Sequence, residues 1–517
     1  MLLNRSAEIR ILIAMVALVI LFNADYTAIN VALVPISKTF NTPISYIQWI
    51  LSGYTLVWAA CSIPGGKLAD HMGYKHTLLL GIGIFGIGTL LGGMSFCSWF
   101  LILSRVIQAI GAAICLPAVY GIIIEGIDCA RQKLAFGLMA SAAAIGLIIG
   151  PTLSSILIYI SNWRFIFFIN LPIVFFAFYV FTINYHNRIK KKQGEQLDYL
   201  NLFLLIFAIM GIALLLNQVS SWDINSIKTF SVLCTSLSAL VFFFATQGQK
   251  KPPILRVSLF AIKPYLGSNL LYIVTMFDFV FFLVIFGLYL QNIKNYSIYN
   301  TGLLFFCFSG AFGCMSLVTP KLLKKLSIFQ VTFVGEVLIT TGFIFVSNFA
   351  DPVSTLKIVF LFLFVGTALG LLFPAFNTKM ASCLPKNIVG EGSGIFLMIG
   401  LLSSSLFTVS SVMLLNFWMN NQFFYLLKHG SLYLTGSQKS NMAEMLAQVH
   451  MSLRSLTKIN IYHGEKYIHI FHLSFYYAMH KLAVIGVTLN FFALIIIRAT
   501  LHKPSYSCIK KVKLNEI

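Results

Sequence analysis

Uncharged stretches of about 20 apolar residues recur along the whole chain, and they restrict its fold more than any other feature. Wound as a helix, such a stretch crosses the roughly 30 Å hydrocarbon core of a bilayer. Backbone N–H and C=O groups find no partner in lipid, so each stretch must be helical. The pattern predicts fourteen spans, near residues 10–35, 45–68, 77–96, 98–121, 134–158, 163–183, 200–217, 228–246, 267–290, 301–318, 329–349, 354–376, 394–417 and 475–498.

The composition agrees with a membrane protein. Of the 517 residues, 58% are hydrophobic and only 10% are charged, whereas a soluble domain has about 25% charged residues. The net charge of +21 does not indicate nucleic-acid binding, because the basic residues lie in short loops between apolar stretches. The nine cysteines are scattered without a CxxC pair, which is typical of small core residues. We therefore expect no metal and no cofactor.

The distribution of Lys and Arg predicts the orientation. Short loops on one side are rich in basic residues, and the short loops on the other side hold only Lys38, Arg164, Lys228, Lys294 and Lys357. By the positive-inside rule, the basic side is cytoplasmic and the number of spans is even. The apolar N-terminal stretch has no small-residue cleavage site and is interpreted as a retained helix. We expect a multi-pass protein of the inner (plasma) membrane with both termini in the cytoplasm.

The first motif, Gly-Gly-Lys-Leu-Ala-Asp-His-Met-Gly-Tyr-Lys-His at residues 65–76, forms a tight charged turn between spans 2 and 3. Gly66 and Gly73 permit close backbone approach, and Asp70 is a fixed anion near basic side chains such as Lys75. An ordinary turn that obeys the positive-inside rule is the alternative interpretation.

Spans 4 and 5 each carry a motif. Arg105, with Gln108 three residues later, lies inside span 4, where an arginine costs at least about 2.5 kcal/mol unless it reaches the interface or a partner. In span 5, the Gly150-Pro151 pair frees a carbonyl and bends the helix, and Gly146 lies four residues before Gly150. A purely structural kink is the alternative.

Taken in order, these segments resemble the motifs of the major facilitator superfamily. Asp25, Thr27, Asn30 and Pro35 in span 1 also resemble the first motif of its fourteen-span drug:proton antiporters. The resemblance implies that the 65–76 loop sets the balance between inward-open and outward-open states, that Arg105 takes part in proton transfer, and that the Gly-Pro segment marks an exporter. The chain departs from the loop motif at two positions, with His71 and Tyr74 where arginines are usual.

The implied fold is an all-α integral membrane protein with two six-helix bundles and two inserted helices. The expected domains are an N-terminal bundle (1–183), a cytoplasmic linker (184–199), two inserted helices (200–246) and a C-terminal bundle (247–517). The last domain contains a long outer loop, 418–474, in which residues 441–458 have an amphipathic pattern.

Three carboxylates lie inside predicted spans, namely Asp25, Asp278 and Glu336. Intramembrane acids are functional candidates, because burial can bring proton binding into the physiological range. We expect them to face a central cavity and, with Arg105, to couple protons to substrate. Further candidates for lining that cavity are Asn30, Gln108, Phe277 and Phe279. A structural acid paired with a polar neighbour is the alternative for each carboxylate.

The sequence contains no P-loop, HExxH motif or nucleophile elbow, so neither ATP-driven transport nor catalysis by an enzyme is indicated. The expected function is efflux of small lipophilic or cationic molecules in exchange for protons. A dedicated exporter of an endogenous metabolite, such as a siderophore, and a non-transporting membrane sensor are the alternatives. The expected partners are the substrate, protons and the lipid bilayer, and a periplasmic adaptor protein is a further candidate.

Overall fold

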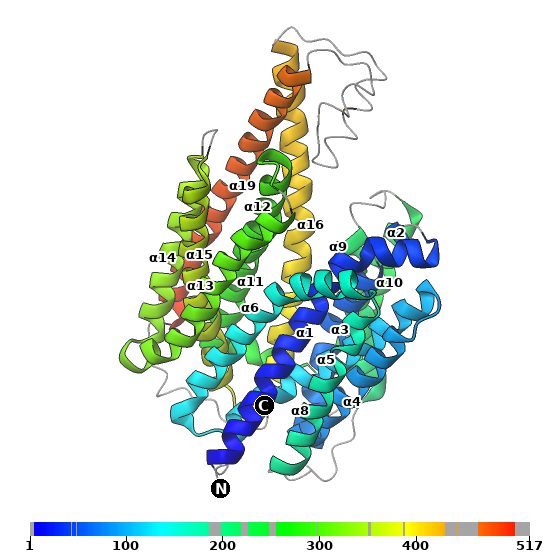
Figure 1. The fold of residues 1–517 in the computed structure, drawn as a ribbon. Helices are drawn as coiled ribbons and strands as arrows, with labels where there is room; N and C mark the ends of the chain where they lie inside the picture. The colour runs from blue at the N-terminus through cyan, green and yellow to red at the C-terminus, as the bar shows by residue number, and fades with distance from the viewer. Residues whose placement is uncertain are drawn as a thin grey trace.

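The computed structural model describes residues 5–42, 44–47, 49–185, 198–218, 226–247, 255–296, 298–349, 353–385, 388–429, 442 and 464–501, and within them the chain is helical without a β-strand (Figure 1). The elements are α1 (Arg5–Phe40), α2 (Ile44–Ile47), α3 (Trp49–Met72), α4 (Tyr74–Gly93), α5 (Ser98–Gly126), α6 (Cys129–Ile160), α7 (Phe165–Phe168), α8 (Leu171–Asn184), α9 (Tyr199–Gln218), α10 (Ile227–Gln247), η1 (Val257–Ala261), α11 (Lys263–Val280), the π-helical turns η2 (Phe281–Ile285) and η3 (Tyr289–Ile293) with α12 (Phe286–Leu288) between them, α13 (Ile298–Lys325), α14 (Ile328–Ser347), α15 (Thr355–Ser382), α16 (Val389–His429) and α19 (Gly464–Leu501).

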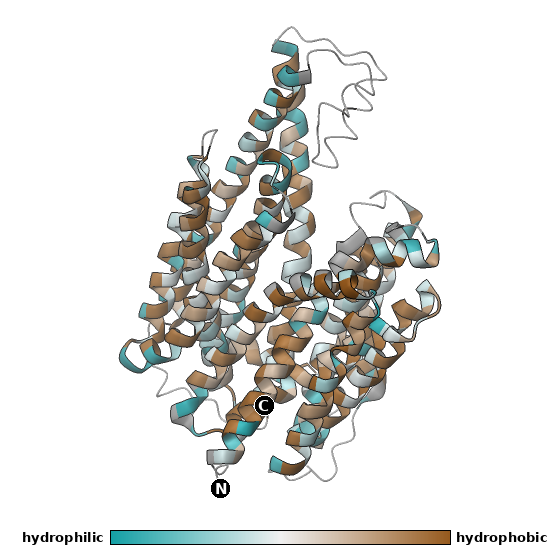
Figure 2. Cartoon of the chain, in the orientation of Figure 1, coloured by the Kyte–Doolittle hydropathy of each residue, from teal (hydrophilic) through white to brown (hydrophobic). Residues whose placement is uncertain are grey.

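Twelve helices among the described residues are long and apolar enough to cross a membrane. Figure 2 shows hydrophobic residues along the middles of the helices and hydrophilic residues gathered near many of their ends. Of the two remaining predicted spans, residues 45–68 lie largely in α3, and residues 200–217 coincide with α9, whose apolar part is the shorter segment Leu200–Leu215. The all-helical membrane fold is confirmed, and the count of fourteen stays a prediction.

The helices form two bundles with the same internal pairing. In the first bundle α1 packs on α6 and α8, and α4 packs on α5 and α8. In the second bundle α11 packs on α16 and α19, and α14 packs on α15 and α19. Each bundle therefore repeats one arrangement, in which α1 corresponds to α11 and α8 to α19. The α9–α10 pair packs through α9 against α3 and α16.

The bundles meet at one end of the molecule, where α3 ends and α16 begins, called here the closed end. Close to this end α3 packs on α16, and α6 packs on α13. Towards the opposite end the two bundles diverge (Figure 1). An arrangement closed at one end and spread at the other is one of the two states that alternating access requires.

Glycines allow α1 and α6 to approach closely within the first bundle. A Cβ on Gly150 would collide with the Thr27 hydroxyl and the Ala24 carbonyl oxygen, and one on Gly146 would collide with the Ile20 carbonyl oxygen. Small residues spaced by four lie on one helix face and let two backbones come together. The predicted gate residues Gly146, Gly150 and Pro151 thus lie in or beside the α1–α6 contact, and α6 continues through Pro151.

The structure differs from the predicted 418–474 loop at both of its ends. Helix α16 continues to His429 and α19 begins at Gly464. At 1.5 Å per residue, the 41 residues of α16 span about 60 Å, twice the hydrocarbon core. The two helices rise together beyond the rest of the molecule (Figure 1). Apart from Met442, residues 441–458 lie outside the described residues, as does most of the predicted linker 184–199.

A regular apolar stripe explains why these helices continue. Four side chains spaced by four on α16 are buried, and they pack in one core cluster with aromatic residues of α19: Leu415, Met419, Phe423 and Leu427 with Tyr467, Phe471 and Phe475. We call this two-helix extension, residues 413–429 and 464–479, the outer hairpin.

Because Gly150 lies at the α1–α6 contact, we expect Gly150→Ala to destabilise the protein by about 1–3 kcal/mol through overpacking. The matched control is Gly83→Ala on α4, where no atom lies within 4 Å of the added Cβ. The control should gain up to about 1 kcal/mol from helix propensity. Thermal unfolding of the purified variants measures both effects, and equal melting of the two variants would contradict the packing argument.

Candidate functional site

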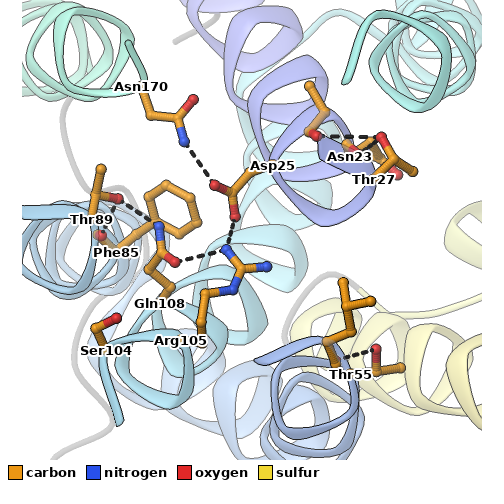
Figure 3. Close-up of polar contacts among 12 residues, drawn as sticks. Asn23, Asp25, Thr27, Thr55, Phe85, Thr89, Ser104, Arg105, Gln108 and Asn170 are labelled. Atoms are coloured by element: carbon orange, nitrogen blue, oxygen red, sulfur yellow. Dashed lines mark hydrogen bonds and ion pairs between the residues drawn. The ribbon is translucent and has the colours of Figure 1, made fainter. Parts of the chain in front are cut away.

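Asp25 is the centre of a buried polar network in the first bundle (Figure 3). Its Oδ2 atom forms an ion pair with Nη1 of Arg105 on α5, and its Oδ1 atom accepts a hydrogen bond of 2.8 Å from Asn170 Nδ2 next to α8. Arg105 Nη1 also donates to Gln108 Oε1 at 2.8 Å, and Gln108 Nε2 donates to Thr89 Oγ1 on α4 at 2.9 Å. Four helical segments are thus connected through one buried ion pair.

Arg105 is fully buried, and its charge is compensated twice. Besides Asp25, the face of the Tyr54 ring lies 4.1 Å from the guanidinium carbon, a cation–π contact. Among the described residues, Nε and Nη2 of Arg105 have no hydrogen-bond partner. The free N–H groups of a buried guanidinium can donate hydrogen bonds to a further ligand or to water.

A second buried acidic cluster lies in the second bundle. Asp278 on α11 accepts a hydrogen bond of 3.0 Å from Asn490 Nδ2 on α19 through its Oδ1 atom. Glu336 on α14 interacts electrostatically with Asp278. Both acids are fully buried, and Asp278 Oδ2 and both Glu336 carboxylate oxygens lack a hydrogen-bond partner among the described residues.

A cavity of about 190 Å³ lies between the two bundles, with walls from α1, α3, α5 and α6 on one side and α11, α13, α15 and α16 on the other. Its described lining contains no acidic or basic side chain. Aromatic residues dominate, namely Tyr26, Trp58, Tyr120, Tyr272, Phe279, Phe312 and Phe373, with Asn23, Thr55, Asn377 and Ser404 as polar groups. The Tyr120 hydroxyl donates to Asn377 Oδ1 at 2.7 Å and so connects the bundles.

The prediction that the three carboxylates face this cavity is wrong for the conformation described. On α1, the cavity-lining residues are Asn23 and Tyr26, and Asp25 lies between them in sequence. Because successive helical residues are about 100° apart, positions 23 and 26 share a face and position 25 points away from it. Figure 3 shows Asn23 and Asp25 on different sides of their helix.

The same register recurs on α11. Met276 and Phe279 line the cavity, whereas Asp278 faces α19. Of the further candidates, Phe279 lines the cavity, and Phe277 packs against the Phe343 and Phe407 rings instead. Gln108 belongs to the Asp25 network, and the side chain of Asn30 lies outside the described residues.

The predicted loop motif forms the α3–α16 contact at the closed end. Asp70 accepts hydrogen bonds from the backbone N–H groups of Gly390 at 2.8 Å and Glu391 at 2.6 Å, at the N-terminus of α16. The Tyr74 hydroxyl also donates to Asp70, at 3.0 Å. A carboxylate at a helix N-terminus is stabilised by the helix dipole and its free N–H groups. Tyr74, where the motif usually has arginine, thus keeps a donor for Asp70 without the charge.

The Asp70 carboxyl lies beyond the apolar stretch of residues 45–68, and burial raises its pKa to about 7. The two backbone donors and Tyr74 oppose that rise by stabilising the ionised form. Loss of any of these donors therefore favours the protonated acid and weakens the contact.

A close glycine contact and an ion pair complete the α3–α16 contact. A Cβ on Gly66 would collide with the Gly390 carbonyl oxygen. Lys67 Nζ lies 3.2 Å from Glu391 Oε2, and the backbone N–H of Arg256 donates to Glu391 Oε1 at 2.9 Å. Two other predicted residues lie beside this contact: Gly73 has φ 86°, a conformation that favours glycine, and Lys75 donates to the Thr182 carbonyl oxygen at 2.7 Å.

Sequence reasoning missed Glu391, Asn490 and Tyr120. Glu391 lies in the glycine-rich segment Gly390-Glu-Gly-Ser-Gly394 directly before an apolar span, and this combination of an acid and flexible backbone is a usable signal. Asn490 is an isolated amide in an apolar stretch. Tyr120 carries no such signal, because an aromatic residue in a span is ordinary.

Two pseudo-equivalent helical bundles around an aromatic cavity, joined at one end only, define an alternating-access membrane transporter. The family model of the Major Facilitator Superfamily matches residues 15–408. The chain belongs to this superfamily and is a multi-pass membrane transporter, and members of the family are not enzymes.

Several relatives are resistance proteins. The multidrug resistance protein Stp of Mycobacterium tuberculosis is 25% identical over 394 residues, which are 76% of this chain and 73% of Stp. The methyl viologen resistance protein SmvA of Salmonella typhimurium is 28% identical over 325 residues, 62% of this chain and 64% of SmvA. The uncharacterized MFS-type transporter YvkA of Bacillus subtilis is 26% identical over 377 residues, 73% of this chain and 84% of YvkA.

Solved structures agree on the fold. The human organic anion transporter MFSD10 superposes with a TM-score of 0.60 at 12% identity, covering 93% of this chain and 99% of that one. The proton:xylose symporter XylE gives a TM-score of 0.59 at 12% identity, covering 95% and 96%. At this identity the likeness concerns the fold alone.

We expect Asp70→Asn to open the closed end. An amide presents an N–H group to one of the two backbone donors, and loss of charge-assisted hydrogen bonds costs about 1–3 kcal/mol. This change shifts the equilibrium between closed and open forms by about fivefold to a hundredfold. Spin labels at His76→Cys and Ser382→Cys, both exposed and on different bundles, report the distance between the bundles.

The control for this experiment is Asp128→Asn, which removes an acid before α6 at the same end but outside the α3–α16 contact. The control should keep the wild-type distance distribution. An unchanged distribution for Asp70→Asn would show that the carboxylate does not hold the closed end together.

Proposed function

We propose that the chain exports small lipophilic or cationic molecules in exchange for protons. The cavity carries this proposal: it lies between the bundles, has an aromatic lining without charge in its described part, and adjoins helices that bury carboxylates on their opposite faces. The names of two relatives, multidrug resistance for Stp and methyl viologen resistance for SmvA, support the same substrate class.

The cavity chemistry suits apolar and cationic cargo. A largely apolar wall with a few polar groups is typical of small-molecule sites. Faces of Trp and Tyr rings attract cations, with about 0.5–2 kcal/mol for each favourable contact, and Trp58, Tyr26 and Tyr272 all line the cavity. Inorganic anions and sugars would lack the charged or numerous polar partners that they need.

Protons are the proposed source of energy, since the sequence contains no P-loop for ATP. A charge that crosses the membrane gains about 2.3 kcal/mol per 100 mV. Asp25 with Arg105, and Asp278 with Glu336, are the intramembrane ionisable groups that would bind and release the proton.

We further propose the inner membrane as the location, with both termini and the closed end on the cytoplasmic side. The excess of Lys and Arg in the loops at that side supports this orientation. The conformation is then outward-facing. Entry of a proton from outside would release cargo, and opening of the α3–α16 contact would return the cavity to the cytoplasm.

Of the alternatives, a dedicated exporter of an endogenous metabolite such as a siderophore shares this mechanism and differs in substrate range. A panel of cationic dyes and drugs against a deletion strain separates the two. A non-transporting sensor predicts no substrate-dependent proton flux.

A periplasmic adaptor protein remains a proposed partner. The outer hairpin supports this proposal, because α16 extends well beyond the length that crosses a bilayer. Large hydrophobic side chains of the hairpin are not covered by the rest of the described chain, with 59% of Phe417 and 56% of Tyr425 exposed.

The Asp25 site is tested by Asp25→Asn in inverted or reconstituted vesicles. The change leaves Arg105 without its counterion, so we expect proton-driven accumulation of a cationic dye to be abolished. Removing one partner of a buried pair also costs about 3–5 kcal/mol of stability. The double variant Asp25→Asn/Arg105→Gln removes both charges and separates lost coupling from lost folding.

The matched control is Glu465→Gln, an exposed acid at the start of α19. It should transport as the wild type does. If Asp25→Asn transports with unchanged rate and pH dependence, Asp25 is not part of the coupling machinery.

A further inference from the structure

A groove of about 390 Å³ lies on the surface of the second bundle, between the start of α14 and the end of α19. Five apolar side chains and one cation line it, namely Phe329, Phe333, Phe491, Leu494, Ile495 and Arg498. It shares no lining residue with the aromatic cavity between the bundles. The groove is therefore separate from the proposed cargo site.

The pairing of α14 with α19 sets the direction of the groove across the membrane. Towards the opposite end of α14, His480 Nδ1 lies 2.8 Å from the Ser347 carbonyl oxygen, and a Cβ on Gly486 would collide with the Phe343 ring. Residue numbers rise along α19 as they fall along α14, so the two helices are antiparallel. Continued at this register, Arg498 lies level with the first turn of α14.

The cation marks the membrane-surface end of the groove, and aromatic side chains mark its inner end. Arg498 lies in the last turn of α19, whereas Phe491 lies two turns earlier, about 10 Å deeper along the axis. On α14, the Phe329 and Phe333 rings are stacked with centroids 6.0 Å apart. The groove thus follows about two thirds of the roughly 15 Å of hydrocarbon in one leaflet.

The apolar wall of the groove is not covered by the described chain. Phe491 is 61% exposed, Ile495 51% and Phe333 43%. In a bilayer these side chains contact lipid hydrocarbon. A chain that lies between two walls touches more protein atoms than one on a flat face, so the groove favours an ordered acyl chain.

The charge at the membrane-surface end is positive only. Arg498 is exposed and forms no ion pair with a described residue. The segment that leads into α14, residues 318–327, contains Lys321, Lys324 and Lys325 and no acid. After Arg498 the sequence continues to residue 513 with four lysines and no acid. Several basic residues directly after a membrane helix favour anionic headgroups.

This charge argues against three other occupants. A lipophilic cation, the proposed cargo, would be repelled by Arg498. A second copy of this chain would bring its own net charge of +21. A zwitterionic lipid carries an ammonium group, for which residues 318–327 and 498–513 offer no carboxylate. An anionic amphiphile suits both the charge and the apolar wall.

The polar atoms at this end suit a phosphodiester. A guanidinium binds two phosphate oxygens through parallel N–H groups. The N-terminus of α14, level with Arg498, adds the positive end of a helix dipole. Ser327 and Gln330 form a capping box there, with hydrogen bonds of 3.0 and 3.2 Å to each other's backbone N–H groups. Because these donors are occupied, the Arg498 guanidinium is the group that contacts the anion directly.

We propose that the groove between α14 and α19 binds one anionic phospholipid, with its phosphodiester at Arg498 and an acyl chain along the aromatic wall. The bound lipid holds the two helices together at the end where the bundles meet. Binding is non-covalent and independent of the proposed transport. Its assignment to the cytoplasmic leaflet alone rests on the orientation given under the proposed function.

Native mass spectrometry of the purified full-length protein tests the headgroup contact. We expect one tightly bound phosphatidylglycerol, with an affinity about fivefold or more above that of phosphatidylcholine with the same chains, because one basic group near an anionic headgroup contributes about 1 kcal/mol. Arg498→Gln should lose this preference. Equal affinity of the wild type for the two lipids would overturn the proposal.

The matched control is Arg10→Gln, which removes the same charge from an exposed arginine at the start of α1. It should keep the preference for phosphatidylglycerol. An equal loss in Arg498→Gln and Arg10→Gln would show attraction by overall charge, and would contradict a site at Arg498.

A second pair of variants tests the apolar wall without changing the charge. In Ile495→Trp a larger side chain fills the groove, so the tightly bound lipid should be lost. Ile344→Trp, at an exposed position further along α14 and outside the groove, should retain it. Retention of the lipid by Ile495→Trp would show that the acyl chain lies elsewhere.

Thermal unfolding distinguishes a lipid from free phosphate and checks folding. Without lipid, all four variants should melt with the wild type, because each changed side chain is exposed. Phosphatidylglycerol should raise the melting temperature of the wild type and Arg10→Gln but not of Arg498→Gln. An equal rise with inorganic phosphate alone would reassign the site to a soluble anion. Neither method measures transport, so absence of dye transport would contradict the proposed function and leave the lipid result standing.

Discussion

The need to compensate buried carboxylates governs the interior of this transporter. An isolated ionised acid in a low-dielectric bundle costs far more than the few kcal/mol by which proteins are stable, so each one must be paired or protonated. The chain uses three solutions. Asp25 is paired with Arg105, Asp70 accepts two backbone N–H groups at the start of α16, and Asp278 accepts one hydrogen bond from Asn490 without a described cation. Because the partners differ, the three carboxylates differ in how readily they bind a proton.

Asp70 is a titratable group within the contact that joins the two bundles. Asp70 and Glu391 join the bundles at the closed end through contacts that exist only when α3 and the start of α16 are adjacent. The Asp25 and Asp278 networks, by contrast, each lie within one bundle and move with it. In the proposed mechanism, rocking of the bundles would break the α3–α16 contact and leave both networks intact. The aromatic cavity lies between the two bundles.

Much of the fold was predictable because hydrophobic length is a direct physical signal. The helical spans, the loop motif around Asp70 and the buried acids all follow from the scarcity of charge in a bilayer. The side of α1 on which Asp25 lies follows from the helical register. The register alone does not say which side faces the cavity, because one cavity-lining residue must first be known. Asn23 and Tyr26 supply that reference in the structure.

Pairings between distant segments, such as Asp278 with Asn490 or Asp70 with Glu391, depend on tertiary packing that no local pattern encodes. The sequence did not predict the outer hairpin. Its two helices continue past the apolar stretch because a stripe of side chains is buried between them, and this burial is visible only when the partner helix is known.

The central claim is that cargo and protons exchange on the same molecule. The most direct measurement is proton release by the purified protein in weakly buffered solution when a cationic dye binds, followed with a pH indicator alongside the dye-binding signal. The account predicts that protons appear in the bulk in proportion to the bound dye and that the yield falls at high pH, where the site is already empty. Saturable dye binding with no proton release across the neutral range would contradict it.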